Sequence, residues 1–306
     1  MFMSKLAVIF PGQGSQYVGM GKDLFENSQT ARELFQKADD VLNLSLSKIC
    51  FEGPEDELRQ TKNTQPAIFL HSAVLLRLIK KMNADFTAGH SLGEYTSLFF
   101  AESINFEDAL KIVRLRGELM QKAGEEQPGT LAAVVGLEPD VVRHVCIEAS
   151  KDGIVQCANF NSPGQIVISG SIAGVRKAMS LAKDNGAKMV KELVVSGAFH
   201  SPLMESAQQG LTNGLNSSNI SDAKIPVYTN VSAKPIRASH EIRQSLQRQL
   251  TSAVLWEDSI RNMISNGADT FIEIGPGKVL QGLIKRINPD VKTFGIDKYN
   301  DLQQIS

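Results

Sequence analysis

Apolar residues recur along this chain in two alternating patterns, short continuous runs and longer stretches with helical spacing. The first run, Leu6 to Phe10, reads as a buried strand, and a turn rich in glycine follows it. Because such strands and helices alternate, we expect a parallel sheet covered by helices. The first part of the chain predicts strands at 6–10 and 84–88, helices at 23–41, at 66–82 and after residue 93, and a polar connection at 52–64.

The pattern changes between residues 128 and 196, where the order becomes strand-helix-strand-strand-helix-strand. That order is typical of a split ferredoxin-like unit, whose ends lie close together, as an insertion requires. The six elements are expected at 130–135, 140–150, 154–160, 165–170, 173–185 and 188–195. After them the first pattern resumes, with strands at 225–230 and 270–274 and helices at 239–251, 256–266 and 277–287.

We therefore predict an α/β fold with two units. A larger, discontinuous parallel-sheet domain would comprise residues 1–127 and 197–306, and a smaller ferredoxin-like domain would comprise residues 128–196. The length of 306 residues agrees with two units at about 150 residues each.

The composition narrows the class of protein. A hydrophobic fraction of 42% and a charged fraction of 21% are ordinary for a soluble globular protein. Lys plus Arg (32) nearly equals Asp plus Glu (33), and no apolar stretch has the length of a membrane helix, so we expect neither nucleic-acid nor membrane binding. The three cysteines, Cys50, Cys146 and Cys157, lack metal-ligand spacing, which predicts no metal site and a reduced, cytoplasmic setting.

The segment Gly89-His90-Ser91-Leu92-Gly93 follows an apolar strand and precedes a helix. This is the context of a nucleophile elbow, in which glycines permit a tight turn around an exposed serine. Ser91 would then lie at a helix N-terminus, where the backbone N–H of Leu92 can stabilise an oxyanion. The alternative is a glycine-flanked serine that only caps the helix.

A serine nucleophile needs a base, and the chain has five histidines. His71 lies among apolar helical residues, and His144 and His240 lie on predicted helix surfaces. His90 adjoins Ser91, but we expect its ring to point away, in a supporting role at most. His200 remains, in a loop that leaves the small unit, and its alternative is a turn histidine bonded to backbone.

Two nearby arginines have different helical surroundings. Arg114 has charged residues among its neighbours three and four positions away and is expected at the surface. The corresponding neighbours of Arg116 are all apolar, so Arg116 is expected to face inward, where a guanidinium needs an anionic partner or several carbonyls. That partner is either an internal carboxylate such as Glu94, in a structural salt bridge, or an acidic ligand.

Six segments occur in the order seen in malonyl-CoA:acyl carrier protein transacylases, and this similarity spans nearly the whole chain. They are Phe10-Pro11-Gly12-Gln13-Gly14-Ser15-Gln16, Gly89-His90-Ser91-Leu92-Gly93-Glu94, Arg116-Gly117 with Met120, Asn161-Ser162-Pro163-Gly164-Gln165, Gly197-Ala198-Phe199-His200-Ser201 and Glu273-Ile274-Gly275-Pro276-Gly277. The resemblance implies a hydrolase-like parallel-sheet core with an inserted ferredoxin-like subdomain.

The resemblance also implies roles for single residues. Ser91 and His200 would form a catalytic dyad without an acidic third member, a backbone carbonyl near Gln249 would hold the histidine ring, and the N–H groups of Gln13 and Leu92 would form the oxyanion hole. Arg116 would bind the free carboxylate of malonyl, because its planar fork suits a bidentate pair.

Phe199 would fill the space that the extra methyl of methylmalonyl needs. The segment from Gly197 to His200 looks closer to stand-alone acyltransferases that serve polyketide synthases, so fatty-acid and polyketide carriers both stay open.

The implied reaction moves malonyl from malonyl-CoA, through a malonyl-Ser91 ester, to the phosphopantetheine thiol of an acyl carrier protein. We expect no bound cofactor, because Gly12-x-Gly14 lacks the third glycine of a dinucleotide loop, and we expect a monomer. An acyl hydrolase with the same dyad and a non-catalytic docking subunit are the alternatives. Candidates for a basic patch that meets an acidic carrier are Lys183, Lys188, Lys191, Lys278, Lys285 and Arg286.

Overall fold

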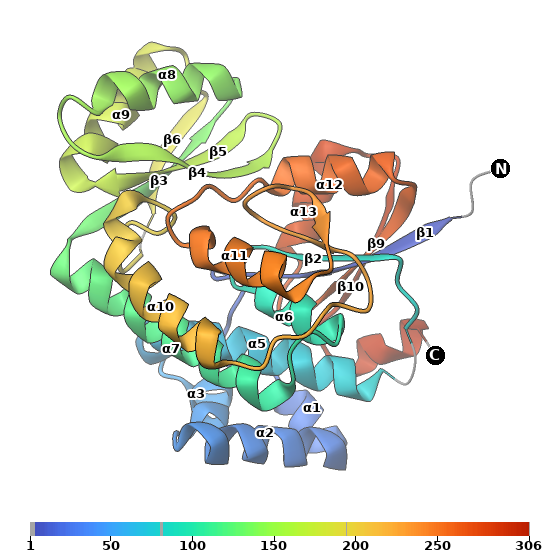
Figure 1. The fold of residues 1–306 in the computed structure, drawn as a ribbon. Coiled ribbons are helices and arrows are strands. Elements are labelled where there is room, and N and C mark those ends of the chain that lie inside the picture. Colours follow the sequence, from blue (N-terminus) through green and yellow to red (C-terminus); the bar gives the residue numbers. More distant parts are fainter. Residues whose placement is uncertain (1–3, 80–81, 194, 306) are drawn as a thin grey trace.

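Two β-sheets, each with its own helices, make up the protein in a computed structural model that describes residues 4–79, 82–193 and 195–305 (Figure 1). Lys80 and Lys81, near the end of the predicted helix 66–82, lie outside the described residues. So does Val194, near the end of the predicted strand 188–195.

The large sheet has six strands in the order β10-β9-β1-β2-β7-β8, and only the pair β7-β8 is antiparallel. Side chains alternate across the sheet, so Val8 and Phe10 enter one hydrophobic core while Ala7 and Ile9 enter another. The strands are β1 (Lys5–Phe10), β2 (Phe86–Gly89), β7 (Val227–Tyr228), β8 (Pro235–Ile236), β9 (Ala268–Ile274) and β10 (Lys292–Ile296).

Helices cover both faces of this sheet, as a buried parallel sheet requires. One core contains residues of α5 (Thr61–Leu78), α6 (Gly93–Phe100) and α7 (Phe106–Glu126), and the other contains residues of α12 (Trp256–Ser265) and α13 (Val279–Ile287). The remaining helices are α1 (Lys22–Asn27), α2 (Gln29–Leu42), α3 (Leu46–Glu52), α4 (Glu55–Arg59), α10 (Glu205–Ser217) and α11 (Ser239–Gln249), with 3-10 turns at Pro202–Met204 and Tyr299–Ile305. None of the helices in the described residues has the length and apolarity to cross a membrane.

The small sheet is antiparallel, in the order β4-β5-β3-β6. On β3, Ala132 and Val134 pack against the two helices of this unit, while the alternate residue Leu131 faces the other way. The elements are β3 (Gly129–Val135), α8 (Pro139–Ala149), β4 (Val155–Ser162), β5 (Gln165–Ser171), α9 (Ile172–Asp184) and β6 (Met189–Leu193). Their order confirms the predicted ferredoxin-like arrangement, and with it the predicted fold class.

Every strand of the small sheet falls between residues 128 and 196. The division into residues 1–127 with 197–306 and residues 128–196 stays a prediction about independent units.

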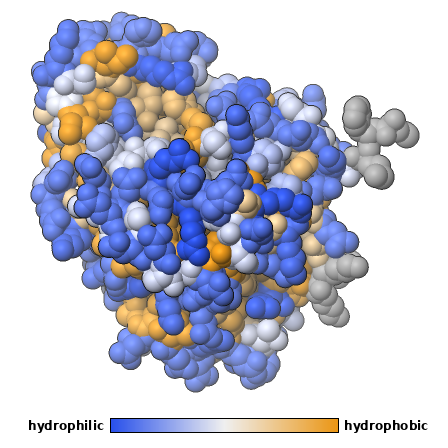
Figure 2. Space-filling view, viewed as in Figure 1, coloured by the Kyte–Doolittle hydropathy of each residue, from blue (hydrophilic) through white to orange (hydrophobic). Residues whose placement is uncertain are grey.

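Main-chain hydrogen bonds join the small sheet to the connection between α11 and α12 in the large unit. The N–H of Val254 donates to Ala158 on β4 (2.8 Å), and the N–H of Phe160 donates to the carbonyl of Val254 (2.9 Å). Figure 2 shows apolar residues gathered over the small sheet below α8, on a face that is otherwise mostly hydrophilic. The bonds to Val254 therefore attach β4 of the small sheet to the large unit.

Three predicted helix boundaries are wrong. The helix predicted at 23–41 is broken at Ser28, whose hydroxyl accepts a hydrogen bond from the N–H of Ala31 and starts α2. The polar connection predicted at 52–64 contains α4 and the first turn of α5. Polar residues, mostly exposed in α4 and buried in the first turn of α5, leave little hydrophobic periodicity, which explains why the sequence did not show these helical segments.

The prediction placed Pro66 at the start of a helix, whereas in the structure it lies inside α5. A proline cannot donate to the carbonyl four residues earlier, which here belongs to Lys62. That carbonyl instead accepts a hydrogen bond from Nη1 of Arg114 (2.8 Å), which also donates to Asn63 (2.9 Å). Arg114 is thus half-buried and bonded to the helix, so its prediction as a surface arginine is wrong.

Candidate active site

Ser91 lies in a sharp turn between β2 and α6, with a left-handed φ of 51°. The flanking glycines leave no room for a side chain, since a Cβ on Gly89 would lie 1.8 Å from the carbonyl carbon of Gly93. A Cβ on Gly93 would lie 2.2 Å from the carbonyl oxygen of Phe10. The strand-turn-helix context predicted for Ser91 is present, and the close approach of backbone explains both glycines.

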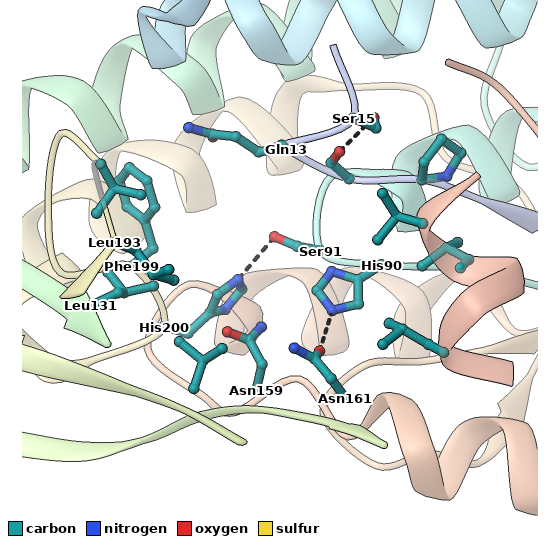
Figure 3. A pocket seen from close by; sticks show the side chains of 18 of the residues that line it. Gln13, Ser15, His90, Ser91, Leu131, Asn159, Asn161, Leu193, Phe199 and His200 are labelled. Carbon is teal, nitrogen blue, oxygen red and sulfur yellow. Dashed lines mark hydrogen bonds between the residues drawn. The ribbon is translucent and has the colours of Figure 1, made fainter. Parts of the chain in front are cut away.

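His200 contacts Ser91 directly, with 2.9 Å between Nε2 and the serine Oγ (Figure 3). Its Nδ1 lies 2.9 Å from the carbonyl oxygen of Gln249 and 3.2 Å from that of Ser252. Because both Nδ1 partners are acceptors, we assign the proton to Nδ1, which leaves Nε2 to accept the hydroxyl proton. The partner of Nδ1 is backbone, as the resemblance implied for Gln249.

The ring of His200 is buried and held neutral. Burial is the main cause that lowers the pKa of His200 to about 3, and the positive charge of Arg116 lowers it further, against the carbonyls of Gln249 and Ser252. At neutral pH the imidazole therefore carries no extra proton and is ready to accept one. It gains that proton only as negative charge develops beside it.

Arg116 is fully buried on α7 and reaches the same serine. Its Nη2 donates to Oγ of Ser91 (3.0 Å) and to Oε1 of Gln249 (2.9 Å), and its Nη1 donates to Oε1 of Gln65 (2.7 Å). Burial lowers the pKa of Arg116, while Tyr95 and Glu94 raise it. Its Nε has no hydrogen-bond partner in the part of the chain that the structure describes.

The alternative of a salt bridge between Arg116 and Glu94 is wrong. None of the ion pairs among the described residues joins them. The side-chain amide of Gln249 lies between the two groups, because its Oε1 accepts from Arg116 while its Nε2 donates to Glu94 (2.8 Å). The guanidinium is therefore near an anion without giving a hydrogen bond to it.

Ser91, His200, Gln13 and Phe199 line one pocket of about 260 Å³. Phe199 is 6% exposed and forms part of its apolar wall, beside strands of the small sheet (Figure 3). The other apolar residues that line the pocket are Met120, Leu131, Val167, Leu193, Val195, Val279, Leu280 and Leu283. Residues of the small sheet, of α7 and α13, and of the segments that follow β1 and β2 thus enclose the serine.

Gln13 follows β1, and its side chain donates to Thr61 (3.3 Å) and points away from Ser91 (Figure 3). Leu92 follows the serine at the start of α6. The backbone N–H groups of Gln13 and Leu92 donate to no other residue among the hydrogen bonds of the described chain. Within the described residues, both predicted oxyanion donors are therefore unpaired.

His90 makes its hydrogen bond with Asn161, at 2.9 Å between Nε2 and Oδ1, and not with Ser91. Its ring nevertheless lines the same pocket, so the expectation that it points away is only partly right. Burial lowers the pKa of His90, and its ring lies 5.6 Å from that of Trp256. Such contacts fix the ring beside the nucleophile.

The other three histidines lie away from the pocket, as their sequence contexts indicated. His144 and His240 are exposed. His71 is buried, and its Nε2 bonds to Asp297. No group of three or more His, Cys, Asp or Glu with the geometry of a metal site occurs within residues 4–79, 82–193 and 195–305.

Three polar residues of the site were not found from the sequence, namely Gln65, Asn159 and Asn230, and Asn161 was named only within a matched segment, without a role. Asn159 and Asn161 are two residues apart on β4 and line the pocket, so their period of two was a usable signal. Asn230 follows β7 at the carboxyl edge of the parallel sheet, where ligands of such sheets bind. Gln65 gave no signal, because it lies between the predicted connection 52–64 and the predicted helix 66–82 and was assigned to neither.

Comparison with known proteins extends these observations. Residues 7–293 match the family model of the acyl transferase domain. The chain is 47% identical over 297 residues to the malonyl CoA-acyl carrier protein transacylase of Bacillus subtilis, covering 96% of this chain and 94% of that protein. It is 46% identical over 302 residues to the protein of that name from Staphylococcus aureus (strain COL), covering 98% of each.

Solved structures agree with these relatives. An acyl carrier protein S-malonyltransferase from Vibrio cholerae superposes with a TM-score of 0.95 at 38% identity, over 99% of this chain and 100% of that one. A malonyl-transacylase solved in complex with its type II PKS acyl-carrier protein has a TM-score of 0.95 at 37% identity, over 99% of each chain. With its fold, its serine turn and its near full-length matches, the chain belongs to the malonyl CoA-acyl carrier protein transacylase family of acyltransferases.

Proposed function

We propose that this chain moves a malonyl group from malonyl-CoA to the phosphopantetheine thiol of an acyl carrier protein, through a malonyl ester on Ser91. One observation carries the proposal: Oγ of Ser91 lies 2.9 Å from Nε2 of His200 and 3.0 Å from Nη2 of Arg116. The nucleophile thus meets a base and a fixed cation at once, which suits an acyl group with a free carboxylate. The relatives named for this activity support it.

In the first half-reaction, Nε2 of His200 takes the hydroxyl proton while Oγ of Ser91 bonds to the carbonyl carbon of the thioester. The N–H groups of Gln13 and Leu92 would stabilise the oxyanion, and each is worth about 3 kcal/mol if other oxyanion donors are a guide. The carbon–sulfur bond then breaks, and the coenzyme A sulfur takes the proton from His200. A malonyl-serine ester remains.

The second half-reaction runs the same groups in reverse. His200 accepts the proton of the phosphopantetheine thiol, the sulfur attacks the ester carbonyl, and the ester bond to Ser91 breaks. The proton then returns from His200 to the serine oxygen, which restores the resting enzyme. The overall transfer needs no redox step and no group beyond the two thiols, consistent with the expectation that no cofactor is bound.

Two further residues would select the acyl group, and two would support the machinery. Arg116 would donate to the malonyl carboxylate in place of its bond to Ser91, and Phe199, on the pocket wall, would exclude an added methyl. His90 would keep Asn161 and the serine turn in place, and the Gln249 carbonyl would orient the His200 ring.

Incubation of the protein with malonyl-CoA alone, followed by peptide mass spectrometry, tests the proposal. We expect a malonyl adduct on Ser91, release of coenzyme A, and transfer when an acyl carrier protein is added. Ser91→Ala should form no adduct. Absence of the adduct on Ser91 in the wild-type protein, with carrier binding intact, would identify a docking subunit instead, and free malonate as the main product would identify a hydrolase.

We also propose a cytoplasmic location for the protein. The carrier must present its phosphopantetheine as a free thiol, and that group stays reduced in the cytoplasm. Cys50, Cys146 and Cys157 are free in the protein, in agreement with such a setting.

A further inference from the structure

The backbone of Ser91 adopts a conformation that it would not hold by itself. Its φ of 51° lies in the left-handed region, where a residue with a side chain is strained by about 1–3 kcal/mol. Such a conformation persists only where surrounding groups hold it. The position of the serine Oγ therefore depends on whatever holds the turn.

One side chain holds this turn from both sides. Oδ1 of Asn230 accepts the N–H of Ser91 at 2.7 Å, and its Nδ2 donates to the carbonyl of Gly89 at 2.7 Å. Asn230 is 1% exposed and follows β7, the strand beside β2 in the sheet. An amide suits this place because it supplies one acceptor and one donor in a fixed geometry.

Asn230 is itself held by a buried carboxylate. Its backbone N–H donates to Oε2 of Glu94 at 3.0 Å, and the same oxygen accepts from Nε2 of Gln249 at 2.8 Å. Nε2 of Gln249 also lies 3.1 Å from the carbonyl of Ser91. Ser91, Asn230, Glu94 and Gln249 thus form a closed ring of hydrogen bonds around the turn.

Burial of the Glu94 carboxyl costs free energy of folding, and an apolar side chain would fill the core without that cost. The residue is 1% exposed, and none of the ion pairs in the described part of the chain includes it. Burial raises the pKa of Glu94 to about 7, although the N–H of Asn230 and the amide of Gln249 lower it. The two donors that bond to its Oε2, the N–H of Asn230 and Nε2 of Gln249, both belong to the ring around the serine.

We propose that Asn230 and Glu94 are positioning residues. They clamp the Ser91 turn and so keep its Oγ within hydrogen-bonding distance of Nε2 of His200 in both acyl transfers. The proposal rests on the proposed function in one respect, the use of Ser91 as the nucleophile. Asn230 acts on the serine directly, and Glu94 acts through Asn230 and Gln249. Neither residue lines the pocket, so neither touches the acyl group.

The first test is Asn230→Ala, measured by the rate at which a small fluorophosphonate labels Ser91 and by steady-state transfer. The fluorophosphonate needs the nucleophile and its base but no carboxylate pocket. We expect the labelling rate and kcat to fall by about ten- to a hundredfold, because small displacements of reacting groups have effects of this size. KM for malonyl-CoA should stay within about twofold of wild type, since Arg116 and the pocket walls keep their places.

Asn262→Ala is the matched control. Nδ2 of Asn262 donates to the carbonyl of Ala233 at 2.9 Å, so this variant removes a hydrogen bond from the same loop without touching the serine turn. Its labelling rate should equal that of wild type. A folded Asn230→Ala protein that labels as fast as Asn262→Ala would overturn the clamp, and so would a change confined to KM.

Glu94 provides a second, independent pair of variants. Glu94→Gln keeps an oxygen that can accept from Asn230 and Gln249, whereas Glu94→Ala leaves the N–H of Asn230 buried and unpaired and leaves Nε2 of Gln249 only its weaker contacts with Ser91 and Asn230. We expect Glu94→Gln to retain most of the labelling rate and Glu94→Ala to lose at least tenfold. If a thermal melting curve shows that Asn230→Ala is unfolded, the two Glu94 variants test the proposal in its place. Equal labelling rates for folded Glu94→Gln and folded Glu94→Ala would overturn the proposal. Wild-type protein that is not labelled on Ser91 would instead refute the proposed function.

Discussion

Gln249 separates the two buried charges of the site. Its side-chain amide takes a hydrogen bond from Arg116 and gives one to Glu94, while its backbone carbonyl orients His200. Since Glu94 takes no hydrogen bond from the guanidinium, Nη2 of Arg116 can exchange its bond to Ser91 for a bond to a carboxylate. A direct salt bridge would have left the arginine with less capacity for an acidic acyl group.

Replacement of Arg116 should therefore change the choice of acyl group. In Arg116→Ala, malonyl transfer should fall about ten- to a hundredfold more than acetyl transfer, because a charge-assisted hydrogen bond contributes about 1.5–3 kcal/mol. The measurement is kcat/KM for malonyl-CoA and acetyl-CoA with one carrier protein. Arg114→Ala, on the same helix but bonded to Lys62 and Asn63, is the control and should leave the ratio unchanged. An equal loss for both acyl groups would refute the carboxylate role.

At the residue scale, the sequence predicted the groups that perform chemistry better than the groups that hold them. Ser91 was predicted from its strand and helix context, and His200 from the surroundings of the other histidines. The structure brings the two together at 2.9 Å. Asn230 and Gln65 were missed because their partners lie 139 and 51 residues away in the chain, and no local pattern reports such contacts.

At the scale of elements, α13 depends on a carboxylate from a neighbouring strand. Glu273 on β9 accepts hydrogen bonds from the N–H groups of Leu280 and Gln281, each at 3.1 Å, and so caps the helix without belonging to it. Val279, Leu280 and Leu283 of this helix line the pocket. The cap therefore links the end of the large sheet to one wall of the site.

Glu273 should make stability depend on pH. Burial raises its pKa to about 7, although the donors of Leu280 and Gln281 lower it. Because its pKa is higher in the folded than in the unfolded protein, ionisation costs stability as pH rises from about 4.5 to about 7, by at most ~3 kcal/mol. Relative to Glu273→Gln, wild type should lose free energy of unfolding over this range, as denaturant titrations at several pH values would measure.

A variant of an exposed glutamate supplies the comparison for that measurement. Glu148→Gln on α8 should give a pH profile parallel to that of wild type. If the profiles of wild type and Glu273→Gln are also parallel between pH 5 and 7, the buried carboxyl does not titrate as described.

Alternation of strands and helices was enough to predict most elements, including all six of the small unit. One element was predicted with the wrong start because its position depends on a tertiary contact. Pro66 sits inside a helix because Arg114 satisfies the carbonyl that the proline leaves free. Strands β8 and β10 were not predicted, since short or edge strands carry little periodicity. Helix α10, of 13 residues, was also missed.

At the scale of the whole molecule, both units present exposed lysine or arginine on, or next to, elements that contribute residues to the pocket. Lys188 and Lys191 are exposed at the small sheet, and Lys278 and Arg286 are exposed beside α13, whose first residues line the pocket. An acidic carrier protein would meet positive charge on both sides of the opening.

Charge reversal on the two sides should therefore weaken the carrier step. In Lys188→Glu with Lys278→Glu, we expect KM for the carrier protein to rise several-fold at low salt, with a smaller change in malonyl-CoA acylation measured without carrier. The difference should shrink as salt increases. Lys22→Glu on α1 is the control, and an equal rise in its carrier KM would show that net charge, not this opening, matters.

The hydrogen bonds that join β4 to Val254 have a consequence for the timing of each reaction cycle. Opening a hinge at this point would break two main-chain hydrogen bonds, each worth about 0.5–1.5 kcal/mol net, so the closed arrangement is favoured. We therefore expect the phosphopantetheine arm of coenzyme A, and that of the carrier protein, to enter and leave lengthwise through a pocket entrance that keeps its width. The residence time of the carrier protein would then depend on its dissociation from the enzyme surface, so weaker carrier binding would give faster turnover.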